Sequence, residues 1–544
     1  MCVKVVYLQG VYTMDLKLTG YNWFSDGCVS ARGYCFDSYG NLYAGNKLLE
    51  YFASASDETS LHDLLTDANG IFAFVINKPD FKAIAIDGSR IYPLFYRLGD
   101  EVSVADNPYD LIDGSSALDK QAVDEYLCSG AVFAGKTLVS EILQVKPSHY
   151  VVFDGVSAHE TEYWNYCTKA GEEMDCSLEQ LDCVFEKVFR RMLESAKGRQ
   201  IVVPLSGGYD SRLIVCWQKR LGVENVVCYT VGRPKSQECH IAEIVAKRLG
   251  YRHYFIDNTS TEFVPSYFYN DADFQKYCHF VGALGNFLWV FEYFAVKWLK
   301  DNAIIDDNAV FVPGHSADFI AGSHLRKALV TQDSSVGYLT SAIMNDSFEY
   351  GCMSSYVHSK VKSYFLANER IGVSAHTNYM SFIMQNRLAH QINNSARLYE
   401  FFGYDVRLPF WDKELLNLFK ALPYKRLENC NLYVEYVSKC VFSKFGVDFG
   451  RNVPDRKAIL RQRLKNRLKP FLPKSFVRKF VMFHDDICER ELTAPMVTEL
   501  IDAGVYADDR HFLSYNEVMR DWYLEMVKRK LVASWRAATV LLGG

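Results

Sequence analysis

The stretch Ile201-Val-Val-Pro-Leu-Ser206-Gly-Gly-Tyr-Asp-Ser211 decides the fold of the 544-residue chain. Its first five residues are an apolar run that predicts a buried strand, and a helical pattern follows over residues 212–221. The two glycines between them let the backbone turn and approach a ligand closely. A strand, a glycine turn and a helix in this order point N–H groups and the positive end of a helix at one place, which favours an anion.

The polar residues of this loop add to the anion hypothesis. Ser206 and Ser211 bring hydroxyl donors, whereas Asp210 would repel a bare phosphate. Mg²⁺ bridging Asp210 to a pyrophosphate resolves that repulsion, because this ion combines few carboxylates with phosphate oxygens. The loop is no Walker motif, since no lysine follows the second glycine at the required spacing.

Strands and helices alternate after the loop. Apolar runs predict strands over residues 226–231 and 253–256, and helical spacing predicts a helix over residues 238–249 between them. This alternation is typical of a parallel sheet with helices on both faces. Beyond residue 273 the pattern is largely helical, and the apolar residues 286–299, which include Glu292 and Lys297, predict a buried helix.

The part before the loop has a different pattern. Short apolar runs bounded by turn residues predict strands over residues 71–76, 83–86 and 150–153. A helix with apolar residues at helical spacing is predicted over residues 172–197. We therefore expect two domains, a mainly β domain over residues 1–165 and a second over residues 175–544.

Composition narrows the class of protein. About half of the residues (49%) are apolar, which excludes a mainly disordered chain. The net charge is only −5, so the chain as a whole has no positive potential that would attract nucleic acid. No apolar run is long enough for a membrane span, and no signal-peptide pattern is present, so we expect a cytoplasmic protein with reduced cysteines. Whether it acts alone or as a homodimer is left open.

One segment is strongly basic. Residues 456–479 contain ten lysines and arginines and no acidic residue, with leucines four positions apart. This pattern predicts an amphipathic basic helix. Its basic face is either solvated, or directed at an anionic substrate or a membrane surface.

The loop resembles the PP-loop of the ATP pyrophosphatase superfamily, and the chain as a whole resembles the asparagine synthetases. The first domain resembles the family's G-x-FAF-x-I and D-x-x-G-x-x-PLYY strings at residues 70–76 and 87–96. The second resembles the strand ending in SGEGxDE at residues 310–318, and E-x-R-x-PFLD at residues 405–412. The resemblance implies a shortened Ntn-hydrolase-like αββα sandwich, then a parallel-sheet PP-loop domain with a helical C-terminal part.

The resemblance also implies the site. ATP would bind with Mg²⁺, and Asp210 and Asp318 would hold the metal. The residues implied for the nucleotide are Pro204, Leu205, Ser206, Gly207, Gly208, Asp210, Ser211, Val231, Gly232 and Gly314.

Three departures from the family limit what the resemblance implies. Cys2 stands where the family has an N-terminal nucleophile, but the family's RGPD string is absent, so we expect no active glutaminase. His315 replaces a family glutamate that handles the incoming nitrogen; it could accept a proton from an amine, or it could be a packed or hydrogen-bonded residue. The family lysine is missing from residues 431–435. Its replacements could be Arg407, Lys439 or Lys457.

These residues predict a carbon–nitrogen ligase that adenylates a carboxylate and transfers ammonia or an amine to it. Aspartate is the default acid. A sugar uronic acid from surface-polysaccharide synthesis, or an internal amide closure, is the rival. A non-catalytic nucleotide-binding homologue or an RNA-modifying enzyme would also fit the loop, and the low net charge counts against RNA.

Overall fold

The computed structural model describes residues 14–20, 22–155, 157–234, 236–258, 272–348, 350, 354–449, 487–507 and 515–542. Contacts divide the chain into two compact units. One comprises Met1–Asp119, Ala134–Asn165 and Ser534–Gly544, and the other comprises Lys120–Phe133 and Tyr166–Ala533. No described helix combines the length and the apolar character that a bilayer crossing requires.

The first unit is built on two β-sheets. Within its described residues, one sheet has seven strands, all paired antiparallel, and the other has four. The larger sheet contains β11 (Ser157–Glu162), β10 (His149–Asp154), β6 (Lys82–Ile86), β5 (Asn69–Asn77), β3 (Val29–Phe36), β2 (Phe24–Ser25) and β4 (Leu42–Ala44). The smaller contains β1 (Met14–Lys17), β8 (Val102–Ala105), β7 (Phe95–Arg97) and β9 (Ile142–Gln144). The strands predicted over residues 71–76, 83–86 and 150–153 are thereby confirmed as β5, β6 and β10.

Two helices cover the larger sheet. In α1 (Asn46–Ala53) and α2 (Glu58–Asp67), apolar residues recur at helical spacing and form one buried face. The ring of Phe52 on α1 stacks on that of Phe74 on β5, with centroids 4.0 Å apart. On the smaller sheet, Tyr96 of β7 packs edge-on against Phe153 of β10 at 5.6 Å, so the two sheets share side-chain contacts.

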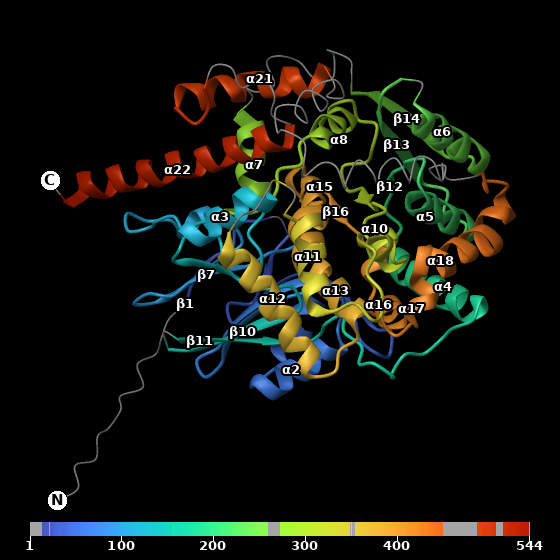
Figure 1. The fold of residues 1–544 in the computed structure, drawn as a ribbon, viewed down its shortest axis with the longest axis horizontal. Helices are drawn as coiled ribbons and strands as arrows, with labels where there is room; N and C mark the ends of the chain where they lie inside the picture. The colour runs from blue at the N-terminus through green and yellow to red at the C-terminus, as the bar shows by residue number, and fades with distance from the viewer. Residues whose placement is uncertain are drawn as a thin grey trace, which may run out of the picture. The chain divides into compact units, whose positions relative to one another are not determined.

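The second unit is centred on a five-stranded, all-parallel sheet (Figure 1). Its order is β14 (Arg252–Asp257), β13 (Val226–Gly232), β12 (Ile201–Pro204), β15 (Val310–Phe311) and β16 (Asp405–Val406). Helix α5 (Tyr209–Arg220) leads from β12 to β13, and α6 (Gln237–Leu249) leads from β13 to β14. The predicted alternation and parallel sheet are confirmed. Because β13 and β15 flank β12 on opposite sides, the strand order reverses at β12, where open α/β sheets bind ligands.

Helix α4 (Leu178–Ala196) packs against α5. The predicted helix over residues 172–197 begins later than expected, because Ser177 and Gln180 close a capping box at its start. The buried rings of Phe189 on α4 and Trp217 on α5 stack with centroids 5.4 Å apart. Such pairs add about 0.5–1.5 kcal/mol beyond the burial of their area, which holds α5 and its N-terminal loop in place.

The rest of the second unit is mostly helical, as predicted, with one correction. The predicted helix over residues 286–299 begins only at Phe291, as α8 (Phe291–Asp301). The preceding residues follow an irregular path, which leaves Trp289 40% exposed. The basic segment, residues 456–479, lies outside the described residues.

Candidate functional site

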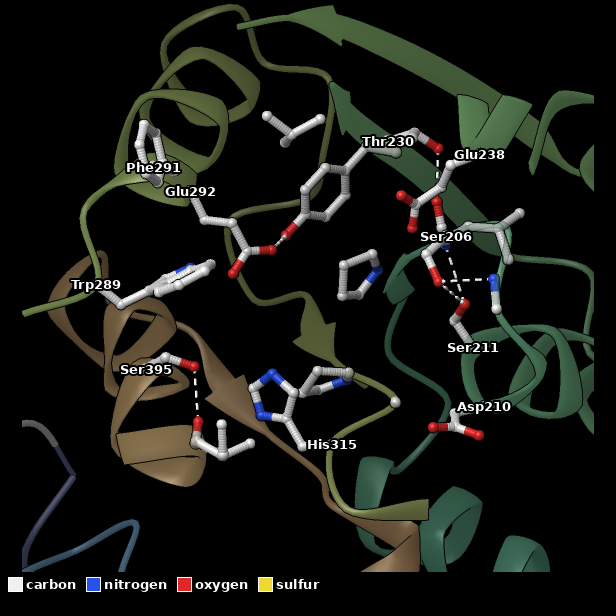
Figure 2. Close-up of a pocket in the computed structure, with 18 of the residues that line it drawn as sticks. Ser206, Asp210, Ser211, Thr230, Glu238, Trp289, Phe291, Glu292, His315 and Ser395 are labelled. Carbon is white, nitrogen blue, oxygen red and sulfur yellow. Dashed lines mark hydrogen bonds between the residues drawn. The ribbon is translucent and has the colours of Figure 1, made fainter. Parts of the chain in front are cut away.

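A pocket of about 650 Å³ opens at the carboxyl end of β12. Its walls come from the ends of β12, β13 and β15, from the start of α8, and from η3 (Met384–Ile392) and α14 (Asn393–Ser395). In Figure 2, Asp210 and Ser211 lie on one side, and Trp289, Glu292 and Ser395 lie on the other. The imidazole of His315 points into the space between them. The residues that line the pocket are Pro204, Leu205, Ser206, Gly208, Tyr209, Asp210, Ser211, Tyr229, Thr230, Val231, Glu238, Asn258, Trp289, Phe291, Glu292, Pro313, Gly314, His315, Gln391, Ile392 and Ser395.

The loop from Ser206 to Ser211 forms one wall. Gly208 is the N-cap of α5, and no side chain caps the helix. The first-turn N–H groups therefore lack the side-chain acceptor that most helix starts have, and a ligand anion could supply it. The Ser211 hydroxyl accepts the Ser206 N–H at 3.0 Å and the Ser206 hydroxyl accepts the Gly208 N–H at 3.1 Å, which fixes the turn.

Close backbone approaches explain two of the glycines. A Cβ on Gly314 would lie 2.9 Å from the Ser211 nitrogen, and a Cβ on Gly207 would lie 2.9 Å from Cα of Glu238. Real Cβ atoms essentially never come so close to backbone, so only glycine allows the β15 loop and α6 to approach this loop. The buried guanidinium of Arg212 also donates to the Gly207 carbonyl at 2.9 Å and holds the loop from behind.

Asp210 lies at the centre of a small polar network. Its Oδ1 accepts the Tyr433 hydroxyl at 3.0 Å, and its Oδ2 accepts the backbone N–H of Asp318 at 3.2 Å. Asp318 itself is on α9 (Ala317–Ile320), and its Oδ2 accepts the Ser323 hydroxyl at 2.9 Å. The structure thus brings the two predicted aspartates together, but only Asp210 lines the pocket.

Two titratable groups on the other side of the pocket have shifted pKa values. Burial lowers the pKa of His315 to about 4, against the attraction of Asp318, so the imidazole is neutral at neutral pH. Its Nδ1 is buried and has no hydrogen-bond partner among the described residues. Burial raises the pKa of Glu292 to about 7, although the hydrogen bond from the Tyr229 hydroxyl, at 3.3 Å, opposes this.

The charges of the lining are all negative. Among the described residues that line it, Asp210, Glu238 and Glu292 are acidic, and none is lysine or arginine. A polyphosphate would therefore need cations from elsewhere. Groups of three or more metal-ligating side chains are absent from the described part of the chain. The loop carboxylate Asp210 would suit Mg²⁺, which takes one or two carboxylates and completes its shell with phosphate oxygens and water.

Comparison with protein families shows which family the chain belongs to. A family model described as asparagine synthase matches residues 185–479, more than half of the chain, and spans the pocket-lining segments. The chain belongs to the asparagine synthase family. A model described as a glutamine amidotransferase domain matches residues 50–164 of the first unit. This asparagine synthase family member is thus a protein of a carbon–nitrogen ligase family with an amidotransferase-type domain, as its sequence predicts.

Solved structures give weaker likenesses. The NH3-dependent NAD synthetase of Campylobacter jejuni is 14% identical and matches 39% of this chain and 94% of its own, with a TM-score of 0.22. The NMN synthetase of Francisella tularensis is 13% identical and matches 47% of this chain and 97% of its own, with a TM-score of 0.20. The glutamine phosphoribosylpyrophosphate amidotransferase of B. subtilis is 12% identical and matches 44% of this chain and 73% of its own, with a TM-score of 0.19. A search of curated proteins found no match to this family member.

Most of the predicted nucleotide residues line the pocket of this family member. Gly207 and Gly232 belong to the same two segments but are not part of the lining. Cys2 lies outside the described residues. The residues of the prediction that do line it are Pro204, Leu205, Ser206, Gly208, Asp210, Ser211, Val231, Gly314 and His315.

Neither of the two basic candidates that the structure describes, Arg407 and Lys439, lines the pocket. Arg407 is buried, and its Nε donates to the Ser195 hydroxyl at 2.7 Å, which fastens β16 to α4. Lys439 forms an exposed ion pair with Glu435 at 2.8 Å. Lys457 lies outside the described residues. Tyr433 of α18 (Asn431–Tyr436), in the stretch where the family lysine is missing, contacts Asp210 instead.

Sequence reasoning missed Trp289, Glu292 and Tyr433. A signal for Glu292 was present, because it is the single carboxylate in the apolar run over residues 286–299. A charge in such a run is costly to bury and is often functional. Tyr433 had no comparable signal, since tyrosines are common in this chain.

Proposed function

We propose that this family member is an AMP- and pyrophosphate-forming ligase, which adenylates a carboxylate with ATP and joins it to ammonia or an amine. The observation that carries the proposal is the uncapped loop of α5, which lines the same pocket as Asp210 at the reversal of the strand order. Membership of a carbon–nitrogen ligase family supports the reaction type.

The pocket residues fit ATP and Mg²⁺. Gly207 and Gly314 allow backbone to approach closely, and the first turn of α5 offers N–H groups to phosphate oxygens. Asp210 would hold the ion, with Asp318 beside it. When bound, Mg²⁺ neutralises the charge of the phosphates and of the departing pyrophosphate. Pro204, Leu205 and Val231 would border the adenosine, because they are the largely apolar part of the adjoining wall.

The reaction we propose has two steps. A carboxylate oxygen of the acid attacks the α-phosphorus, and the bond to the pyrophosphate oxygen breaks. The nitrogen nucleophile then attacks the acyl carbon, and AMP leaves with the electron pair of the broken C–O bond. The imidazole of His315 is neutral at neutral pH and would accept a proton transiently at this stage, since a pKa of about 4 makes it a weak base.

We further propose that the first domain, residues 1–165, is a shortened Ntn-hydrolase-like sandwich, joined to a synthetase domain over residues 175–544. The two sheets, their contact at Tyr96 and Phe153, and the cover of α1 and α2 support this arrangement. The missing RGPD string supports a domain without glutaminase activity, because a fold can persist after its site has been lost.

The test is the product of ATP cleavage. Purified protein is incubated with ATP, Mg²⁺ and a panel of acids that includes aspartate and uronic acids, and release of AMP and pyrophosphate is measured. Asp210→Asn should lose most of this activity. Asp333→Asn, the same change at an exposed position, is the control. Release of ADP and phosphate, or full activity of Asp210→Asn, would refute the proposal.

A further inference from the structure

The side of the pocket facing the α5 loop is aromatic and acidic. Trp289, two residues before α8, exposes 40% of its surface. Glu292, in the first turn of α8, brings a carboxylate to the same wall. Figure 2 shows both residues on the wall away from Asp210, with the His315 imidazole pointing towards the space before them.

The carboxylate of Glu292 has one partner in the described structure. The Tyr229 hydroxyl donates to its Oε1 at 3.3 Å, and no described lysine or arginine forms an ion pair with it. Glu292 is partly buried, and a carboxylate that is partly removed from water costs free energy unless a cation or several donors satisfy it. The raised pKa of Glu292 has the same cause, because burial disfavours the ionised carboxylate and one hydrogen bond from Tyr229 does not offset this.

A bound cation would supply that compensation. Trp289 presents an indole face, which attracts an ammonium group through its quadrupole. The other acidic groups of the lining, Asp210 and Glu238, belong to the phosphate side. An inorganic cation is a poor match for the wall of Trp289 and Glu292, because only one carboxylate is there and the indole offers no oxygen ligand.

We infer that Glu292 and Trp289 form the binding site for the ammonium group of an organic primary amine, which is the nitrogen substrate of the ligase. This inference rests on the proposed function and specifies its second substrate. One proton passes from the ammonium to Glu292, and the nitrogen lone pair forms the C–N bond. The C–O bond to AMP then breaks with its electron pair on AMP, and the second proton passes from nitrogen to His315.

The first experiment measures binding without any reaction. Saturation-transfer NMR on the full chain compares n-propylammonium with n-propanol, which has a similar shape and no charge. The ammonium should bind better than the alcohol. Glu292→Gln should weaken ammonium binding by about tenfold or more, since it removes the charge and keeps the shape. Glu369→Gln, at an exposed position of α12 (Ser355–Arg370), should leave it unchanged.

A second variant covers the case in which Glu292→Gln does not fold. Trp289→Ala removes an exposed side chain outside any helix, and should also weaken n-propylammonium binding. Equal binding of ammonium and alcohol by the wild-type protein, or unchanged ammonium binding in both variants, would overturn the inference.

The second experiment identifies which substrate carries the ammonium. With an acid that supports pyrophosphate release, Glu292→Gln should leave the KM for the acid in ATP–pyrophosphate exchange unchanged and should raise the KM for the amine in amide formation. A raised KM for the acid would mean that the ammonium belongs to the acyl substrate, which overturns the assignment to the nucleophile. If no acid releases pyrophosphate, the proposed function fails while the NMR result still stands.

Discussion

Tyr433→Phe tests whether the contact to Asp210 is needed for catalysis. The Tyr433 hydroxyl donates to Asp210 Oδ1 at 3.0 Å, from the stretch in which the family lysine is missing. A hydrogen bond to a charged group contributes about 1.5–3 kcal/mol, so its removal should lower kcat/KM about ten- to a hundredfold. Asp210 keeps the N–H of Asp318 at 3.2 Å, which is why the loss should be smaller than in Asp210→Asn.

The assay is ATP–pyrophosphate exchange over a range of Mg²⁺ and ATP concentrations. Tyr433→Phe should lower kcat and change the Mg²⁺ dependence of exchange, because the Tyr433 hydroxyl orients the Asp210 carboxylate and does not contact the acid substrate. Tyr338→Phe is the matched control, since its exposed hydroxyl donates only to the Ala328 carbonyl at 3.0 Å. Exchange by Tyr433→Phe within twofold of wild type, at unchanged thermal stability, would show that Asp210 does not depend on this contact.

Three further predictions concern the loop, the buried acid and the nitrogen source. Gly314→Ala should abolish ATP binding measured by calorimetry, because its Cβ would lie 2.9 Å from the Ser211 nitrogen, whereas Gly337→Ala, with no atom closer than 3.9 Å, should bind normally. The pKa of Glu292 rises from 4.5 to about 7 on folding, so its stabilising contribution is complete below 4.5 and is lost as pH rises towards 7. Thermal unfolding of wild type should therefore lose more stability across that window than Glu292→Gln does, and parallel pH curves would contradict this. Cys2→Ala should leave ammonia- or amine-dependent synthesis unchanged, and glutamate release from glutamine that disappears in this variant would restore glutamine as the donor.

The local sequence alone predicts the strands and helices around the loop. The run over residues 201–205 can only be buried, and Gly207 and Gly208 end it, so β12, the turn and the start of α5 follow from pattern alone. The same holds for β13 and α6, where a strand pattern changes to helical spacing. Both the parallel sheet and the loop that lines the pocket could therefore be predicted.

The opposite wall could not be predicted, because tertiary contacts determine it. Residues 286–299 are apolar enough for one helix, yet α8 starts at Phe291 and the preceding residues form part of the pocket wall. Periodicity cannot show where a helix starts when no capping residue marks the position, and the N-cap Val290 makes no side-chain hydrogen bond. The sequence also does not show that Arg407, a charge in a family-like string, is buried and donates to Ser195 within the core.

The distribution of charge connects the two ends of the pocket. At the loop, Asp210 and Glu238 line the place proposed for the phosphates, and this acidic lining is compatible with an anion that binds together with Mg²⁺, as proposed above. At the far wall, Glu292 faces Trp289 without a basic partner in the described lining, so a group that binds there gains by being cationic. A cationic group on a substrate would therefore be compensated at the far wall, whereas the phosphates would be compensated at the loop together with their metal.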